Sequence, residues 1–290
     1  MFMEVQAPAK INLTLRVFGK RMDGYHTLES IVQTITLTDS LTFESAAEGM
    51  FFSCSDPVLE GEDNLVMRAA RLLQTRSAVP RGARIHLEKR IPQQAGLGGG
   101  SSDAATALIA LNELWDLHLP LDDLSTLATD LGSDVPFFLH GPSALIGGRG
   151  ELVRPLAHNT RAFVVLAKPA AGLATSEVYT RLQAMPQLPD EEIFLRSAAQ
   201  VMLNALNAGD VNLIARAMVN DLERSAYILL PDLARLRERM RTHGCLGVQL
   251  CGSGSSLVGI CADESVAKAA AAELLNDCPW TWAGPWTMAG

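Results

Sequence analysis

The feature that most restricts the fold of this chain is a run of glycines between a strand-like stretch and a helix-like stretch. Four glycines occupy five positions in Gly96-Leu97-Gly98-Gly99-Gly100, and Ser101-Ser102-Asp103 follows them. Glycine permits positive φ angles and lets another group approach the backbone closely. A helix that begins here presents unpaired N–H groups and a partial positive charge. The run therefore predicts an anion site, and phosphate is the anion that fits it most naturally.

Standard phosphate-loop patterns do not describe this run. The Gly-Lys-Ser/Thr ending of a Walker A loop is absent, and Ser101 stands where a Gly-x-Gly-x-x-Gly pattern has its third glycine. A flexible loop followed by a helix cap is the structural alternative. The flanking strand over residues 84–90, which Pro92 ends, and the flanking helix from Ser101 onward favour phosphate binding over that alternative.

The first half of the chain mixes strands and helices. Residues 5–17 alternate apolar and polar, which predicts a strand with Lys10 and Asn12 on the same side, about 7 Å apart. A turn over residues 21–26 leads to a second strand over 35–43. The remaining predictions are a helix that starts near Asp63 as its N-cap, a helix over 121–131 that ends at Gly132, and a short helix that begins at Ser133-Asp134-Val135-Pro136.

The second half predicts an α+β arrangement beyond a boundary near residues 149–156, where glycines and Pro155 interrupt the chain. The predicted elements are a strand over 163–167, long helices within 193–243, strands over 245–250 and 256–261, a helix over 264–276 and a last strand over 280–286. The loop 252–256 between two of these strands fits either a plain hairpin or a second phosphate-binding backbone nest.

Charge and cysteine content exclude several classes of protein. The formal net charge of −8 argues against wide binding to nucleic acid or to an anionic membrane. Five cysteines without a C-x-x-C pair predict reduced thiols and no zinc site. The sequence shows no signal peptide and no uninterrupted apolar stretch long enough for a membrane span, so we expect a cytoplasmic protein.

Several motifs, taken in order, resemble the GHMP kinase superfamily over nearly the whole chain. They are APAKINLTLRVFGKRMDGYHTLES, EDNLV, PQQAGLGGGSSDAATAL, LGSDVPFFLHG and CGSGSS. The Asp-Gly-Tyr-His segment is the most specific of them, and the glycine run alone supports only the superfamily. The resemblance implies a two-domain α+β GHMP kinase fold. Residues 1–152 would form an ATP-binding domain like domain 2 of ribosomal protein S5, and residues 153–290 a ferredoxin-like domain that completes the substrate cleft.

The resemblance also implies a reaction: ATP-dependent phosphorylation, by direct in-line transfer, of the 2-hydroxyl of a cytidine-diphosphate-linked alcohol in non-mevalonate isoprenoid synthesis. Lys10 and Asp134 match the catalytic lysine and the catalytic base. The other matches fall into two groups. ATP would be bound by Asn64, Lys89, Pro92, Gly96, Leu97, Gly98, Gly99, Gly100, Ser101 and Ser102, and the substrate by Asn12, Tyr25, His26 and Tyr179.

The same resemblance implies Mg²⁺ held mainly by ATP phosphates and water, no protein metal site, no nucleic-acid or membrane partner, and a monomer or weak homodimer. Two positions depart from the family pattern, since Gln94 stands where glycine often opens the loop and Cys251 where threonine or serine is usual. The alternatives are another GHMP kinase, acting on homoserine, a mevalonate or a sugar, and a non-catalytic nucleotide-binding protein. An RNA-binding module is a third, against which the net charge argues.

Overall fold

The computed structural model describes residues 2–22, 24–77, 81–183 and 191–288. The chain divides into two compact units that each collect several stretches of sequence. Unit 1 comprises Met1–Ala9, Leu37–Pro92 and Gly98–Gly141, and unit 2 comprises Lys10–Thr36, Gln93–Leu97 and Pro142–Gly290. The predicted domains, residues 1–152 and 153–290, are each one continuous stretch of the chain, and they stay a prediction.

Two long strands, β1 (Phe2–Lys20) and β2 (His26–Ala46), supply residues to both units. In unit 1, β4 (Gly82–Glu88) pairs antiparallel with β2, and β3 (Met50–Cys54) pairs in parallel with β4. Buried and more exposed residues alternate over residues 2–9 of β1 and 83–87 of β4, as the alternating sequence predicts, whereas residues 9–15 of β1 are buried at every position. The strands β1 and β2 are longer than the predicted strands over 5–17 and 35–43, and β3 was not predicted.

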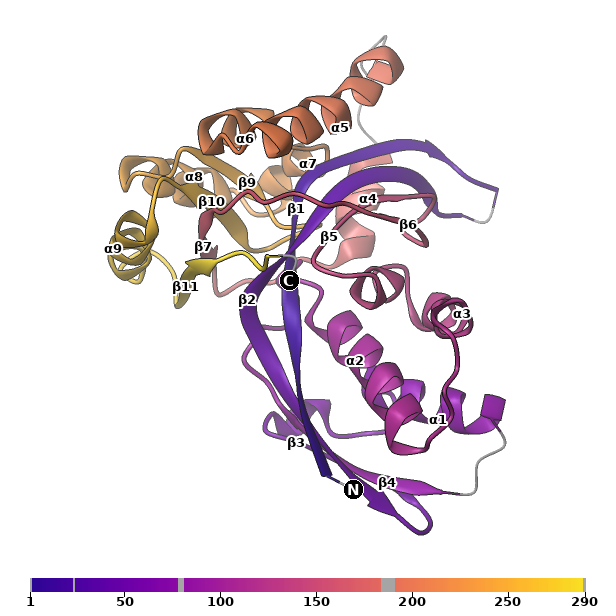
Figure 1. The fold of residues 1–290 in the computed structure, drawn as a ribbon. Coiled ribbons are helices and arrows are strands. Elements are labelled where there is room, and N and C mark those ends of the chain that lie inside the picture. Colours follow the sequence, from indigo (N-terminus) through magenta and orange to yellow (C-terminus); the bar gives the residue numbers. More distant parts are fainter. Residues whose placement is uncertain (1, 23, 78–80, 184–190, 289–290) are drawn as a thin grey trace. The chain divides into compact units, whose positions relative to one another are not determined.

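The helices of unit 1 are α1 (Leu65–Ser77), α2 (Gly99–Leu114) and α3 (Leu121–Leu131), with short 3₁₀ turns η1 (Pro57–Leu59) and η2 (Pro136–Leu139). In Figure 1 the three α-helices lie together on one side of the strands of this unit. Alanines of α2 and α1 are buried where the two helices pack, which lets their backbones approach closely. The predicted helix over 121–131 and the short helix after Val135 are confirmed.

In unit 2, β5 (Ser143–Gly147) pairs antiparallel with β2, and β6 (Leu152–Pro155) pairs with β5. The short strand β8 (Val219–Asn220) runs parallel to β1, with Thr14 opposite Val219. Neither β5 nor β6 was predicted, because each has only four or five residues and glycines follow the first of them directly.

A second sheet of unit 2 has the strand order β11-β7-β10-β9 and is antiparallel throughout. Helices α8 (Asp232–Thr242) and α9 (Glu264–Leu274) pack on it (Figure 1). The strands are β7 (Phe163–Lys168), β9 (Gly247–Leu250), β10 (Leu257–Cys261) and β11 (Trp280–Pro285), and the other helices are α4 (Thr175–Gln183), α5 (Glu191–Ala208), α6 (Val211–Ala217) and α7 (Glu223–Leu229). The predicted α+β character of this half is confirmed.

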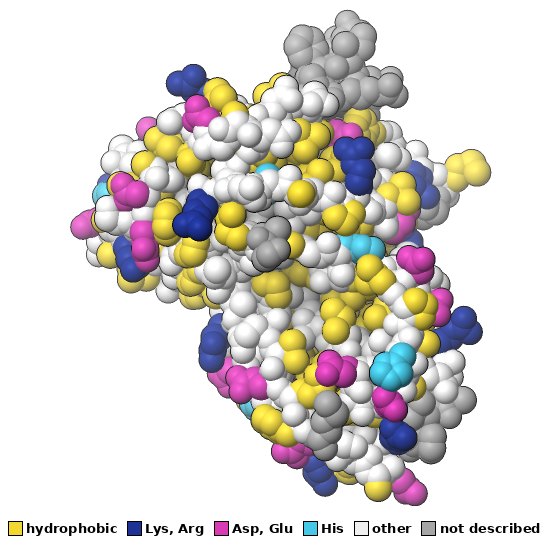
Figure 2. Space-filling view, in the orientation of Figure 1, with side chains coloured by type: hydrophobic (Ala, Val, Ile, Leu, Met, Phe, Trp, Pro, Cys, Tyr) yellow, Lys and Arg dark blue, Asp and Glu magenta, His cyan; other side chains and the backbone are white. Residues whose placement is uncertain are grey.

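The cysteines, the helices and the surface charge can be compared with the expectations from composition. All five cysteines are free and buried. No helix among the described residues is long and apolar enough to span a membrane. On the face shown in Figure 2, acidic and basic side chains are interspersed, and the basic ones do not gather into one patch.

Candidate active site

The second half of the glycine run shapes the start of α2 in unit 1. Gly98 precedes the helix with a φ of 71°, a left-handed conformation that favours glycine. The Ser102 N–H donates to the Gly98 carbonyl oxygen at 2.9 Å, so the amides of Gly99, Gly100 and Ser101 are those that helix geometry leaves without an internal acceptor. Ser102 is fully buried, and its hydroxyl has no hydrogen-bond partner among the described residues. These groups fit a phosphate.

The first half of the run packs against a second glycine segment within unit 2. A Cβ at Gly96 would lie 1.8 Å from the carbonyl oxygen of Cys251, so no side chain fits there. The Ser255 N–H donates to the Gln94 carbonyl oxygen at 3.2 Å. The loop 252–256, for which the sequence left open a plain hairpin or a second nest, is therefore bonded through backbone atoms to Gln94 and Ala95, which directly precede the glycine run.

Lys10 lies between these two segments. Its side chain is buried, with a residue exposure of 4%, and its Nζ donates to Asn12 Oδ1 at 2.9 Å. Its backbone N–H donates to the Leu97 carbonyl oxygen at 2.9 Å, and a Cβ at Gly252 would lie 3.4 Å from Nζ. Asn12 in turn donates from Nδ2 to Ser30 Oγ at 2.8 Å. The prediction that Lys10 and Asn12 lie on one side of β1 is confirmed.

Asp134 belongs to unit 1, in the turn between α3 and η2. The Val135 N–H donates to the Gly132 carbonyl oxygen at 3.2 Å, and this bond closes the turn that carries Asp134. The side chain is half-buried. Lys10 belongs to unit 2, and the predicted pairing of the two side chains stays a prediction.

Asn64 caps α1, and the expectation that Asp63 is the N-cap is wrong. The helix begins at Leu65, and Asn64 Oδ1 accepts a hydrogen bond from the Val66 N–H at 2.9 Å. Its Nδ2 donates to the Leu59 carbonyl oxygen at 3.0 Å. Asparagine and aspartate cap equally well, so the two neighbouring candidates could not be separated by residue type. The predicted role of Asn64 near the adenine stays a prediction.

Lys89 has an ammonium group that lies between two buried carboxylates. Its Nζ is 2.5 Å from Asp39 Oδ2 and 2.8 Å from Asp103 Oδ2. Burial lowers the pKa of Lys89, but the two carboxylates outweigh burial and raise that pKa above its ordinary value. The predicted role of Lys89 near the adenine stays a prediction. Asp39 and Asp103 were not predicted as site residues, although Asp103 follows the glycine run directly.

Two residues predicted for the cytidine pocket, His26 and Tyr179, contact each other in unit 2. Their ring centroids are 5.3 Å apart, and the planes are tilted by 34°. Gln183, which was not predicted, places Nε2 3.1 Å from His26 Nε2. Burial and, to a smaller extent, the charge of Lys20 lower the pKa of His26, so the ring is neutral near pH 7.

Tyr25 is 52% exposed and has the guanidinium of Arg149 over its ring, 5.2 Å from the centroid. The turn that carries Arg149 is fixed to β2, because the Leu28 N–H donates to the Gly148 carbonyl oxygen at 2.8 Å. The Arg149 N–H donates to Glu151 Oε2 at 2.7 Å. In the sequence, Arg149 was interpreted only as part of a domain boundary. A basic residue between two glycines was the signal that could have indicated a binding-site residue.

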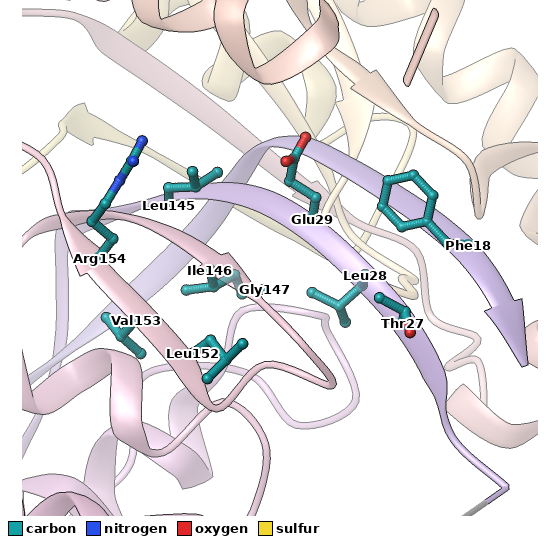
Figure 3. A pocket seen from close by; sticks show the side chains of 10 residues that line it. All are labelled: Phe18, Thr27, Leu28, Glu29, Leu145, Ile146, Gly147, Leu152, Val153 and Arg154. Carbon is teal, nitrogen blue, oxygen red and sulfur yellow. The ribbon is translucent and has the colours of Figure 1, made fainter. Parts of the chain in front are cut away.

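A cavity of about 440 Å³ opens next to the Tyr25–His26 segment in unit 2. Figure 3 shows that its lining comes from β1, β2, β5 and β6, with Glu29 and Arg154 as the charged side chains. None of the predicted site residues lines it. The cavity could not be predicted from the sequence, because β5 and β6 were not predicted.

Both departures from the family pattern have structural counterparts. Gln94 adopts a φ of 50°, the left-handed region that favours glycine. Cys251 is fully buried, and burial raises the pKa of its thiol to about 12 although the charge of Lys10 opposes that rise. The thiol is therefore protonated and unreactive at neutral pH. Within the described ranges, no group of three or more His, Cys, Asp or Glu side chains could hold a metal ion.

Comparison with known proteins assigns the class. The family model of the GHMP kinases N terminal domain matches residues 64–142, and that of the GHMP kinases C terminal domain matches residues 202–279. The first match includes the start of α2 and Asp134, and the second includes the loop 252–256. The chain belongs to the GHMP kinases, and it is accordingly an ATP-dependent small-molecule kinase.

Relatives that match nine-tenths or more of this chain share the name of one enzyme. The 4-diphosphocytidyl-2-C-methyl-D-erythritol kinase of Pelotomaculum thermopropionicum is 43% identical over 94% of this chain and 93% of its own. The enzyme of that name from Shouchella clausii is 42% identical over 90% of this chain and 86% of its own. The crystal structure of a 4-(cytidine 5'-diphospho)-2C-methyl-D-erythritol kinase, 39% identical, superposes with a TM-score of 0.84 and covers 99% of this chain and 100% of the other.

Proposed function

We propose that this chain transfers the γ-phosphate of ATP to the 2-hydroxyl of 4-diphosphocytidyl-2-C-methyl-D-erythritol, in the non-mevalonate route to isoprenoid precursors. The relatives above, at about 40% identity over at least nine-tenths of the chain, support this substrate. The observation that carries the proposal is the position of Lys10. Its backbone is bonded to Leu97 of the glycine run, while its ammonium is held by Asn12 and lies close to Gly252.

The phosphates of ATP bind at the start of α2. The free amides of Gly99, Gly100 and Ser101 and the buried Ser102 hydroxyl supply donors, and the positive end of the helix dipole favours the anion. The buried Ser102 hydroxyl, which has no hydrogen-bond partner among the described residues, supports this assignment. Mg²⁺, carried by the ATP phosphates and water, neutralises phosphate charge when bound.

Asp134 and Lys10 act on the attacking hydroxyl. Its oxygen forms a bond to the γ-phosphorus as the bond from that phosphorus to the β,γ-bridging oxygen breaks, and ADP leaves. The hydroxyl proton passes to the Asp134 carboxylate. The charge of the Lys10 ammonium lowers the pKa of the attacking hydroxyl.

Tyr25, His26 and Tyr179 recognise the cytosine. Both tyrosine rings can stack on a flat base, and the neutral His26 ring keeps its Nδ1–H as a donor, because its Nε2 accepts from Gln183 Nε2. A polar site built for the base discriminates strongly against alcohols that lack it. The further expectations, a cytoplasmic monomer or weak homodimer without nucleic-acid or membrane partners, belong to this proposal.

The test is a coupled ADP-release assay with and without the cytidine diphosphate substrate. We expect ADP release that depends on this substrate, and no release with homoserine, mevalonate or a sugar in its place. Transfer to one of those alcohols instead identifies another GHMP kinase activity. Binding of ATP without transfer to any alcohol identifies a non-catalytic nucleotide-binding protein.

A variant of Tyr25 separates substrate recognition from ATP binding. Stacking of a base on an aromatic ring is worth roughly 1–3 kcal/mol, so Tyr25→Ala should raise KM for the cytidine substrate roughly tenfold. The KM for ATP should stay unchanged. The variant Tyr25→Phe keeps the ring and is the control. A rise confined to the KM for ATP would contradict the place of Tyr25 in the cytidine pocket.

A further inference from the structure

Three side chains from three elements of unit 1 form a buried charge cluster at the start of α2. Asp39 comes from β2, Lys89 directly follows β4, and Asp103 lies in the first turns of α2. The exposed fractions of the three side chains are 0%, 9% and 3%. The proposed function uses neither carboxylate, so their burial beside the glycine run needs its own explanation.

Asp39 fixes the segment that enters the glycine run. Its Oδ1 accepts hydrogen bonds from the backbone N–H groups of Arg90 at 2.6 Å and Ile91 at 2.8 Å. Its Oδ2 binds the Lys89 ammonium at 2.5 Å. One carboxylate therefore holds both the backbone and the side chain of the residues immediately before Pro92.

The Lys89 ammonium lies against the first residue of α2. A Cβ at Gly99 would be 3.2 Å from Lys89 Nζ and 2.9 Å from Ile91 Cγ2, so the ammonium lies beside the space that a side chain at Gly99 would occupy. A cation at the N-terminal end of a helix is opposed by the helix dipole, and its burial is costly without a partner. Asp103, at 2.8 Å from Nζ, supplies that partner from within the helix.

We infer that Asp103 is a positioning residue for ATP: by holding Lys89 against Gly99, it fixes the amides at the start of α2 in the arrangement that accepts the phosphates. Asp39 anchors the same ammonium from the sheet. Asp103 acts through Lys89 and the backbone and does not itself touch the nucleotide. This inference rests on the proposed function, since it takes ATP as the ligand of these amides.

Removal of the Asp103 carboxylate leaves a buried ammonium with one partner at the positive end of the helix. Lys89 then follows Asp39 away from Gly99, and the helix start loses the contact that orders its amides. Asparagine at this position keeps an oxygen that can accept from Lys89, so it should preserve most of the arrangement. Alanine has no oxygen that could accept from Lys89. A comparison of the two substitutions therefore separates loss of the contact with Lys89 from a general change in α2.

The experiment compares Asp103→Ala, Asp103→Asn and wild type by steady-state kinetics for both substrates, calorimetric binding of MgADP, and thermal unfolding. We expect Asp103→Ala to raise KM for ATP and the Kd for MgADP about tenfold, equivalent to about 1.4 kcal/mol. KM for the cytidine substrate should change less than twofold. Asp103→Asn should restore both nucleotide constants to within about threefold of wild type.

The matched control is Asp277→Asn, which breaks an ion pair of 2.9 Å with Arg239 in unit 2. It should lower Tm without a change in either KM. If Asp103→Ala proves insoluble, Asp103→Ser, which is also too short to reach Lys89, takes its place. Nucleotide constants within twofold of wild type, or a parallel rise of both KM values that tracks Tm as in a general loosening, would overturn the inference.

The same data separate this inference from the proposed function. If the wild type phosphorylates none of the alcohols in the panel, the proposed function fails, while MgADP binding by the Asp103 variants still decides the positioning role. If the wild type phosphorylates the cytidine substrate but Asp103→Ala binds MgADP like wild type, only the positioning role fails.

Discussion

The two glycine-rich segments of this chain are held by different forces. In unit 1 the start of α2 is fixed by charge, through the Lys89 ammonium between Asp39 and Asp103. In unit 2 the loop 251–256 is fixed by uncharged hydrogen bonds. There, Asn220 Nδ2 donates to the carbonyl oxygens of Leu250 and Gly252 at 2.9 and 2.8 Å, and Ser255 donates to Gln94.

This difference shows how two loops of similar composition can respond to different perturbations. A buried charge cluster responds to pH and to neutralisation of one partner, because charge burial is costly. A backbone-bonded loop responds to volume and to φ, because its atoms are already in contact. Variants that change charge in one segment and shape in the other therefore test whether the two segments are independent.

The largest effect is expected for Lys10, which lies beside the backbone-bonded loop. Lys10→Met removes the ammonium but keeps a chain of similar length. If Lys10 assists proton removal from the hydroxyl, kcat should fall roughly 100-fold or more, within the range for general acid–base assistance. Binding of MgADP should change less than twofold. Asp134→Asn should give the same pattern, and a near-wild-type kcat in either variant would remove that residue from the mechanism.

A glycine variant tests the backbone contact in unit 2. Gly96→Ala places a Cβ 1.8 Å from the Cys251 carbonyl oxygen at a φ of 73°, and we expect a loss of roughly 3 kcal/mol or more in unfolding free energy. Gly209→Ala is the matched control, since Gly209 has a φ of 67° but no atom within 4 Å of the added Cβ. It should cost only about 1–2 kcal/mol. Chemical denaturation measures both, and equal losses would exclude the contact as the cause.

The charge cluster should give the stability a pH dependence that the backbone-bonded loop lacks. Burial raises the pKa of Asp103 to about 7; the Lys89 charge opposes this rise and the Asp39 charge adds to it. The Cys54 thiol also interacts electrostatically with Asp103. Between pH 4 and 7 the folded state therefore keeps a proton that the unfolded state releases, and unfolding free energy falls as pH rises.

Asp103→Asn removes this titration. The stability of wild type relative to the variant should therefore decrease from pH 5 to pH 8, by roughly 2–3 kcal/mol. Urea denaturation at the two pH values measures it. A difference that is constant with pH, or one that grows, would contradict the raised pKa of Asp103.

The contrast between the segments also explains which parts of the site the sequence could predict. Lys10 and Asn12 were placed together because strand alternation is a local rule with a period of two. The prediction of a phosphate site at the start of α2 followed from glycines that precede a helix, which is equally local. The roles proposed for Asp134, Tyr25 and His26 came from the family resemblance, since a turn residue carries no periodic signal.

Residues missed by the sequence analysis depend on long-range pairing. Asp39 meets Lys89 because β2 and β4 pair with Ser40 opposite Glu88, a register that periodicity within one strand does not give. Arg149 meets Tyr25 because the β5–β6 turn is bonded to β2 at Leu28. The wrong N-cap prediction at Asp63 has another origin. Asp63 and Asn64 cap equally well, and the contact of Asn64 with Leu59 of η1 is a structural difference that residue type does not reveal.

The smallest effect is expected at Gln94, the position that departs from the family's glycine. Its φ of 50° costs a side-chain-bearing residue about 1–2 kcal/mol, whereas glycine costs about 0.5–1 kcal/mol in unfolded-state entropy. Gln94→Gly should therefore raise the unfolding free energy by about 0.5 kcal/mol. The neighbour Gln93 is not among the positive-φ residues, so Gln93→Gly should instead lower it by about 0.5–1 kcal/mol. Opposite signs in urea denaturation would place the strain at Gln94, where the carbonyl accepts from Ser255; equal losses would mean that the backbone-bonded segment carries no such strain.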